Sequence, residues 1–220
     1  MLSESYLSII EALTTGKSNT AKVCKLVEHD SGLVRRVLSI ANSAYYSVPG
    51  GIKTLKQALF VLGQTVVLEV ALAETLQTSL QGLSPKARQK KIRAWCDKFM
   101  IATCVKVAAK KRELSEIDIW YTAALVLGTE LDLDNTKYKN TYPEPLMKWA
   151  KKNKKNLTEL LELSLVSYEA FIVEQQSGLL ETLASEEQRQ DESMKHALTL
   201  AQARLSELLG AKTYEEILAA

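Results

Sequence analysis

The spacing of apolar residues constrains the fold of this chain most. In the first segment, Leu2, Tyr6, Ile9 and Leu13 recur every three or four residues, which places one apolar stripe on a helix. The same spacing returns along most of the chain, and only 9 glycines and 4 prolines punctuate its 220 residues. An all-β fold would need alternating apolar residues and many more turns. We therefore predict an all-α, multi-helix fold.

Helix boundaries can be placed where capping residues precede an apolar stripe. Asp30 and the Thr54–Gln57 pair are typical N-caps, Ser84–Pro85 is a typical helix start, and Ser115 with Asp118 is interpreted in the same way. Gly63 is expected to interrupt a helix, and residues 130–145 are expected to form a loop. We predict helices over about residues 2–15, 20–28, 31–41, 55–62, 65–81, 85–111, 116–127, 157–176 and 185–209.

The chain is long enough to bury a sizeable core. No repeat, low-complexity tract or flexible linker divides it, so we predict a single domain over residues 1–220. Within it we expect an N-terminal helical lobe over about residues 1–83 and a second lobe over about 84–220 that share one core.

Charge, cysteine content and hydropathy exclude several classes of protein. The formal net charge of +2 does not provide the broad positive surface of a dedicated nucleic-acid-binding protein. Cys24, Cys96 and Cys104 lack the spacing of a zinc or redox pair, so we expect free buried thiols in a reducing compartment. No apolar run approaches the roughly 20 residues that span a bilayer, and no signal peptide is recognised. We expect a cytoplasmic protein without a membrane partner.

Two blocks of sequence resemble a known family. Residues 26–46, centred on Ala41-Asn-Ser-Ala-Tyr-Tyr46, are similar to the signature stretch of HDOD domains, bacterial modules distantly related to the HD phosphohydrolases. Residues 52–63, which end in Leu62-Gly63, resemble the second block of that family. The resemblance is good over residues 20–128 and looser elsewhere. It implies an N-terminal helical lobe followed by a degenerate HD-like lobe.

The signature block has two interpretations. Polar residues at a helix end usually satisfy backbone groups and fix the following turn, and this is the interpretation that we favour. In the alternative, they line a groove for a partner or a small ligand. The candidate partner-binding or structural residues are Asn42, Ser43, Tyr45, Tyr46 and Gly63.

The resemblance also predicts where a catalytic metal would bind. An HD phosphohydrolase holds its metal with His and Asp side chains, and a retained His-Asp pair follows a short apolar helix. Here that run is Ala123-Ala-Leu-Val-Leu-Gly128, which puts Leu127 and Gly128 at the positions of the pair. His29–Asp30 lies in the wrong lobe, and His196 has no companion ligands. We therefore predict no metal site, no cofactor and no catalytic residue.

Two polar segments are candidates for a phosphate-binding site and a calcium site. Lysines surround Trp149 and could hold the phosphates of a nucleotide or nucleic acid, although a solvated lysine-rich turn is the simpler interpretation; the residues of this candidate patch are Lys151, Lys152, Lys154 and Lys155. Asp132, Asp134 and Asn135 suggest a calcium loop, but the glycine and closing glutamate of an EF-hand are absent. We interpret that segment as an acidic loop.

The sequence thus favours a regulatory protein over an enzyme. The resemblance implies bacterial signal transduction, with sensor kinases, response regulators or diguanylate cyclases as partners. No such domain is recognised within the 220 residues, so we expect a stand-alone adaptor. A degenerate metal-dependent phosphohydrolase and nucleotide or nucleic-acid binding through the lysine patch remain alternatives, and a homo-oligomer is left open.

Overall fold

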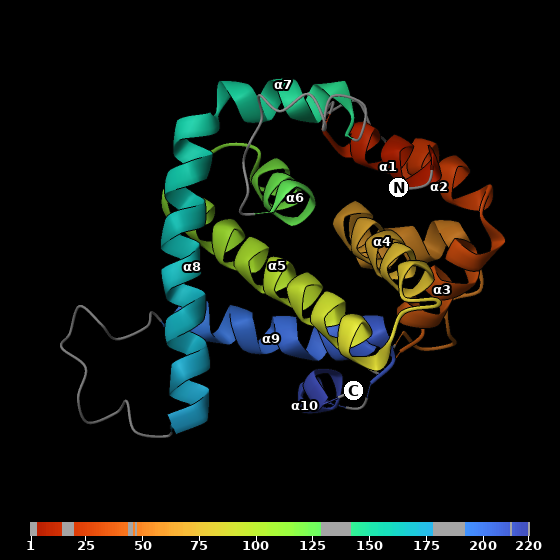
Figure 1. Cartoon of the computed structure of the whole chain (residues 1–220). Coiled ribbons are helices and arrows are strands. Elements are labelled where there is room, and N and C mark those ends of the chain that lie inside the picture. The colour runs from red at the N-terminus through yellow and green to blue at the C-terminus, as the bar shows by residue number, and fades with distance from the viewer. Residues whose placement is uncertain are drawn as a thin grey trace.

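The structure, a computed structural model, describes residues 4–14, 20–43, 46, 48–128, 142–177, 192–211 and 213–219. Within these residues it contains α-helices and no strand, which confirms the all-α prediction (Figure 1). The helices are α1 (Glu4–Thr14), α2 (Thr20–Glu28), α3 (Ser31–Ala41), α4 (Leu55–Ser79), α5 (Pro85–Lys111), α6 (Ile117–Leu127), α7 (Glu144–Lys152), α8 (Lys154–Ser177), α9 (Glu192–Leu209) and α10 (Tyr214–Ala219).

Helices α3 and α4 begin where local capping chemistry predicts. The Asp30 side chain accepts hydrogen bonds from the backbone N–H groups of Gly32 and Leu33 and so caps α3. Thr54 and Gln57 form a complete capping box at the start of α4. Gly63 then takes φ 74° and kinks α4 rather than ending it, because a glycine adopts this left-handed backbone angle without steric cost.

Helix α4 corrects one expectation about apolar length. Its 25 residues are long and apolar enough to cross a membrane by length and composition, although we expected no such run. However, 56% of its most apolar window is buried inside the fold. That burial is typical of a core helix.

Helix α5 crosses the molecule and packs against α6, α8, α9 and α10 (Figure 1). Ser84 caps it as predicted, and Pro85 occupies its first turn. The predicted start of α6 is wrong in detail. The N-cap is Glu116, in a left-handed conformation with φ 59° and no side-chain cap bond, whereas the Ser115 carbonyl accepts a hydrogen bond from Trp120 Nε1.

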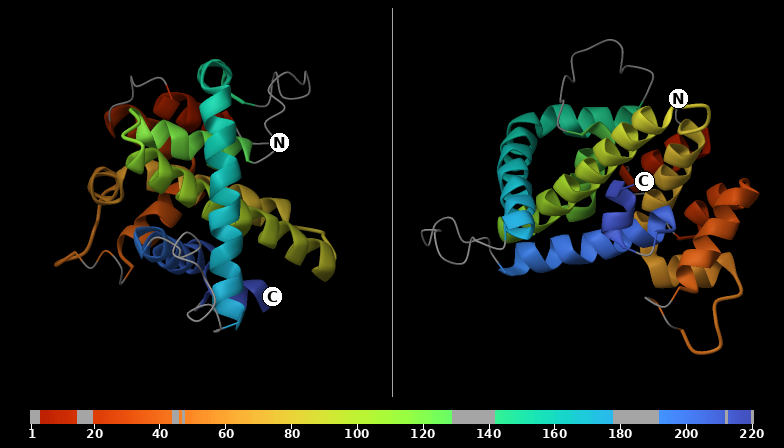
Figure 2. Two further views of the ribbon diagram at one scale, coloured as in Figure 1. Left: turned by 90° about the vertical axis from the view of Figure 1, so that its left-hand side faces the viewer. Right: turned by 60° about the horizontal axis from the view of Figure 1, so that its bottom comes forward.

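Of the last four helices, α8, α9 and α10 pack against α5, and α7 packs against α1 and α8 (Figure 2). α7 begins at Glu144, one residue before the end of the predicted loop, and the lysine-rich segment is two helical ends that meet at Asn153 instead of a turn. α10 was not predicted, since six residues carry too little periodicity. One cluster of buried apolar side chains takes members from each of these ten helices.

Candidate functional site at the helix junction

A buried ion pair joins helix α4 to helix α9. Glu69 in α4 and Arg204 in α9 lie with Oε2 and Nε 2.9 Å apart, and their side chains are only 8% and 15% exposed. Glu69 interrupts an otherwise apolar run from Val66 to Ala73. A buried carboxylate is tolerated only when it is paired and hydrogen-bonded. The pair therefore fixes where α9 packs on α4.

Two tyrosines complete this group. Tyr121 in α6 donates a hydrogen bond from its hydroxyl to Glu69 Oε1 at 2.8 Å. Arg204 Nη1 donates to the hydroxyl of Tyr46, and the guanidinium carbon lies 5.6 Å from the centroid of the Tyr46 ring. We call Tyr46, Glu69, Tyr121 and Arg204 the junction cluster. Both carboxylate oxygens of Glu69 therefore accept a hydrogen bond. Helices α4, α6 and α9 and the segment after α3 meet at this cluster.

The protonation states of Tyr46, Tyr121 and Arg204 are fixed near neutral pH. Burial, followed by the nearby Glu69 carboxylate, raises the pKa of Tyr121 well above its usual value. Burial also raises the pKa of Tyr46, although Arg204 opposes that shift. Burial alone would lower the pKa of Arg204, but Glu69 and Tyr46 outweigh it and raise that pKa. The tyrosines stay neutral and the arginine stays charged, as in a structural network.

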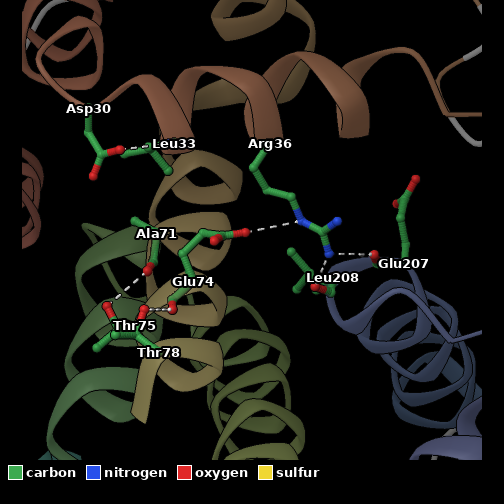
Figure 3. Close-up of polar contacts among 9 residues, drawn as sticks. All are labelled: Asp30, Leu33, Arg36, Ala71, Glu74, Thr75, Thr78, Glu207 and Leu208. Carbon is green, nitrogen blue, oxygen red and sulfur yellow. Dashed lines mark hydrogen bonds and ion pairs between the residues drawn. The ribbon is translucent and has the colours of Figure 1, made fainter. Parts of the chain in front are cut away.

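A second arginine ties α9 to the N-terminal helices (Figure 3). Arg36 in α3 forms an ion pair with Glu74 in α4, with Nε and Oε1 3.4 Å apart. Its Nη2 donates to the backbone carbonyls of Glu207 and Leu208 at the end of α9. A cation there satisfies carbonyls that have no partner within the helix and complements the helix dipole. α9 is thus held at two points by arginine contacts.

A polar cavity of about 480 Å³ borders the junction cluster beside the α4 kink. Besides Glu69 and Arg204, its lining includes Gly63 and the ion pair of Lys106 with Asp118, 3.2 Å apart. Lys106 Nζ also lies 5.2 Å from the ring centroid of Tyr121. Paired charges of both signs could hold a small polar ligand. Of the residues singled out from the sequence, Gly63 and Tyr46 are brought to this region.

Of the remaining signature residues, Asn42 bonds to the backbone through its side chain and Ser43 only through its main chain. Asn42 Nδ2 donates to the carbonyls of Leu38 at 2.9 Å and Ile52 at 2.8 Å, and Asn42 Oδ1 accepts from the Ile52 N–H at 2.7 Å. Asn42 therefore closes the loop between α3 and α4. Ser43 N–H bonds to the Ile40 carbonyl, and its buried hydroxyl has no hydrogen bond within the described residues. Tyr45 lies outside the described residues.

The lysine patch lies at the corner between α7 and α8, away from the junction cluster (Figure 1). All of its lysines are exposed, namely Lys151, Lys152, Lys154 and Lys155. Trp149 packs edge-on against Trp120, with ring centroids 4.6 Å apart, and donates to Glu116 Oε2. Its indole is engaged in the fold, so the patch lacks a free aromatic platform for stacking a base. Asp132, Asp134 and Asn135 lie outside the described residues.

The residues at the expected metal position do not fit a metal. Leu127 and Gly128 end α6, and neither side chain can ligate. The Lys98 side chain lies against Gly128, so that a Cβ built there would be 2.9 Å from Lys98 Cε and 3.2 Å from Nζ. An ammonium group repels a divalent cation. Within the described parts of the chain, no three His, Cys, Asp or Glu side chains are grouped to hold an ion, and His29 and His196 are exposed.

The cysteines are free thiols of low reactivity. Cys96 and Cys104 are buried, and burial raises the pKa of each to about 12. Cys24 is half-buried, and burial and its bond to Glu28 raise its pKa. Because the thiolate is the nucleophilic form, none of these groups is prepared for covalent catalysis at neutral pH.

Sequence reasoning missed the charged half of the junction cluster. Glu69 and Arg204 are not singled out by any motif, and Tyr121, which the sequence alone does not place in the core or on the surface, is buried. The available signal was Glu69, a lone charge inside an apolar helical run, because such a charge needs a partner in the folded chain. The identity of that partner could not be obtained from spacing, since 135 positions separate the two residues.

Comparisons with known proteins place the chain as follows. Residues 1–166 match the model of the HDOD domain. No curated protein matches. A crystal structure from Shewanella amazonensis SB2B, described as a "Putative metal-dependent phosphohydrolase", is 17% identical and aligns over 100% of this chain and 91% of its own length, with a TM-score of 0.41. At that score the likeness carries no argument about activity.

Proposed function

The chain belongs to the HDOD domain family, and from this premise we propose that it is a non-enzymatic signal-transduction module of the bacterial cytoplasm. It acts through protein–protein contacts, with sensor kinases, response regulators or diguanylate cyclases as the class of partner. Family membership supports the class of protein, and the local chemistry of the second lobe supports the absence of catalysis.

The observation that carries the proposal is the chemistry around Gly128. Metal-assisted phosphoester hydrolysis needs imidazole and carboxylate ligands that converge on an ion and activate water. An aliphatic side chain, a bare backbone and the Lys98 ammonium stand at the corresponding place. None of these side chains supplies the imidazole or carboxylate that this chemistry needs.

The junction cluster supports a way to transmit binding. It connects α4 and α6 to α9, and Arg36 adds a second link between α3, α4 and α9. A partner that prefers one arrangement of α9 over another would shift this equilibrium, because a ligand moves a conformational balance by its difference in affinity for the two states. In this proposal the module transmits contact and performs no chemistry.

A binding panel tests the proposal. The purified chain is immobilised, and purified receiver, histidine-kinase and diguanylate-cyclase domains from the source organism are passed over it in biolayer interferometry. We expect saturable binding to at least one class, and hydrogen exchange should change in α9 when that domain binds. Binding to none of the three classes, together with turnover of a nucleotide by the same preparation, would overturn the proposal.

A further inference from the structure

The outer face of α8 carries a second apolar stripe that the fold does not bury. One face of this helix enters the core through residues such as Leu157, Leu160 and Phe171. The opposite face presents Leu163, Val166 and Val173, which are 50%, 65% and 52% exposed. Figure 2 (left) shows α8 lying in front of the other helices.

The spacing on this face is that of a helix-pairing seam. Leu163, Val166, Ala170 and Val173 follow one another at intervals of three, four and three residues. These are the a and d positions of a heptad, whose side chains insert between those of a facing helix. We call these four residues the α8 seam. A solvated helix face has no need of such a repeat, whereas a docked helix does.

Charge along α8 itself is negative beside the α8 seam. From Asn156 to Ser177 the helix has four glutamates and no lysine or arginine. Glu162 and Glu169 directly precede apolar seam residues, at the flanking positions that set partner choice in paired helices. Both are exposed, and neither forms an ion pair within the described chain. Glu159 contacts Arg112 at 3.7 Å.

The α8 seam also borders a hollow. A cavity of about 810 Å³ lies between α5, α8 and α10, and Val173 belongs both to its lining and to the seam. Ile101, Leu165 and Ile172 give this cavity an apolar wall, and Arg93, Asp97, Lys98 and Glu169 add charges of both signs to its lining. A pocket next to an exposed apolar stripe can accept one large side chain of a partner. Such anchoring side chains often provide most of the binding energy of an interface.

We propose that the α8 seam docks an amphipathic helix of a partner protein that has apolar residues at heptad spacing and Lys or Arg beside them. The inference rests on the proposed function, for which it names a binding surface. A second copy of this chain fits less well, because paired seams would bring Glu162 and Glu169 against like charges. Residues 178–191 of the chain itself fit less well for the same reason, since they carry four acidic residues and a single arginine.

Two model peptides test the seam directly. Each has three heptads with Leu at a and d and a fluorescent label; one has Lys and the other Glu at the flanking positions. Fluorescence anisotropy with the full-length protein should give saturable binding of the Lys peptide, weaker by at least about tenfold for Val166→Glu. The Glu162→Lys/Glu169→Lys variant should bind the Lys peptide about fivefold to tenfold more weakly and gain affinity for the Glu peptide.

A control variant is Phe60→Glu, which changes an apolar residue on α4 that is 87% exposed, against 65% for Val166, and should leave peptide binding unchanged. Equal binding of both peptides, or no effect of Val166→Glu, would overturn the inference. A concentration-dependent dimer that Val166→Glu abolishes would assign the seam to a second copy instead. A large loss of melting temperature in Val166→Glu would show that the chain covers the seam itself. None of these results decides the outcome of the interferometry experiment that tests the proposed function, because the receiver, kinase or cyclase domain can bind through another surface of this chain.

Discussion

Removing one partner of the buried ion pair should destabilise the fold strongly. Arg204→Met leaves the Glu69 carboxylate buried with only the Tyr121 hydroxyl, and Glu69→Met leaves Arg204 with only the Tyr46 hydroxyl. Because an uncompensated charge then stays in a low-dielectric environment, each change should lower the free energy of unfolding by about 3–5 kcal/mol. The double variant removes both charges, so its loss should be smaller than the sum of the two single losses by a coupling energy of about 2–3 kcal/mol.

Urea unfolding monitored by circular dichroism measures this cycle. With a slope of about 2–3 kcal/mol/M for a chain of this size, each single change should shift the midpoint by about 1–2 M. The matched control is the exposed pair Arg112–Glu159, whose side chains are 42% and 46% exposed; Arg112→Met should cost less than about 1 kcal/mol. Losses that add within about 0.5 kcal/mol in the double variant would refute the pairing of Glu69 with Arg204.

Three further predictions follow from other contacts. Asn42→Ala removes three hydrogen bonds that close the loop between α3 and α4 and should lower the free energy of unfolding by about 2 kcal/mol in urea titration; no change would contradict this role. Burial raises the pKa of Cys96 and Cys104 from about 9 to about 12, so their contribution to stability is complete below pH 9 and lost between pH 9 and 12. The urea midpoint should therefore fall over that range, and less steeply in the Cys96→Ala/Cys104→Ala variant; equal slopes would refute the assignment. With a thiol-reactive dye at pH 8, Cys24 should react first and the other two only on unfolding, whereas three equal rates would contradict their burial.

The sequence predicts the features of this fold that are local. Asp30, the Thr54–Gln57 pair and Ser84 act as caps because a capping bond spans only two or three residues. Gly63 marks the kink because its backbone angle is a property of one residue. The start of α6 was misplaced because the left-handed Glu116, and not a side-chain cap, begins that helix.

The contacts that build the junction cluster are not local. The resemblance pointed to Tyr46, but its partner Arg204 is 158 positions away, and the packing of α9 on α4 decides which residues meet. The α8 seam was hidden for a related reason. Its apolar residues follow the same helical spacing as core residues, and only the packed structure separates the buried face from the exposed one.

The most direct test of the central claim is elemental analysis of the protein purified without a chelator. The claim is that Leu127, Gly128 and the Lys98 ammonium leave the second lobe unable to hold a catalytic ion. Inductively coupled plasma mass spectrometry should find divalent metal well below one ion per chain, before and after incubation with Mn²⁺ and gel filtration. About one tightly held ion per chain would contradict the claim and return the protein to the class of metal-dependent hydrolases.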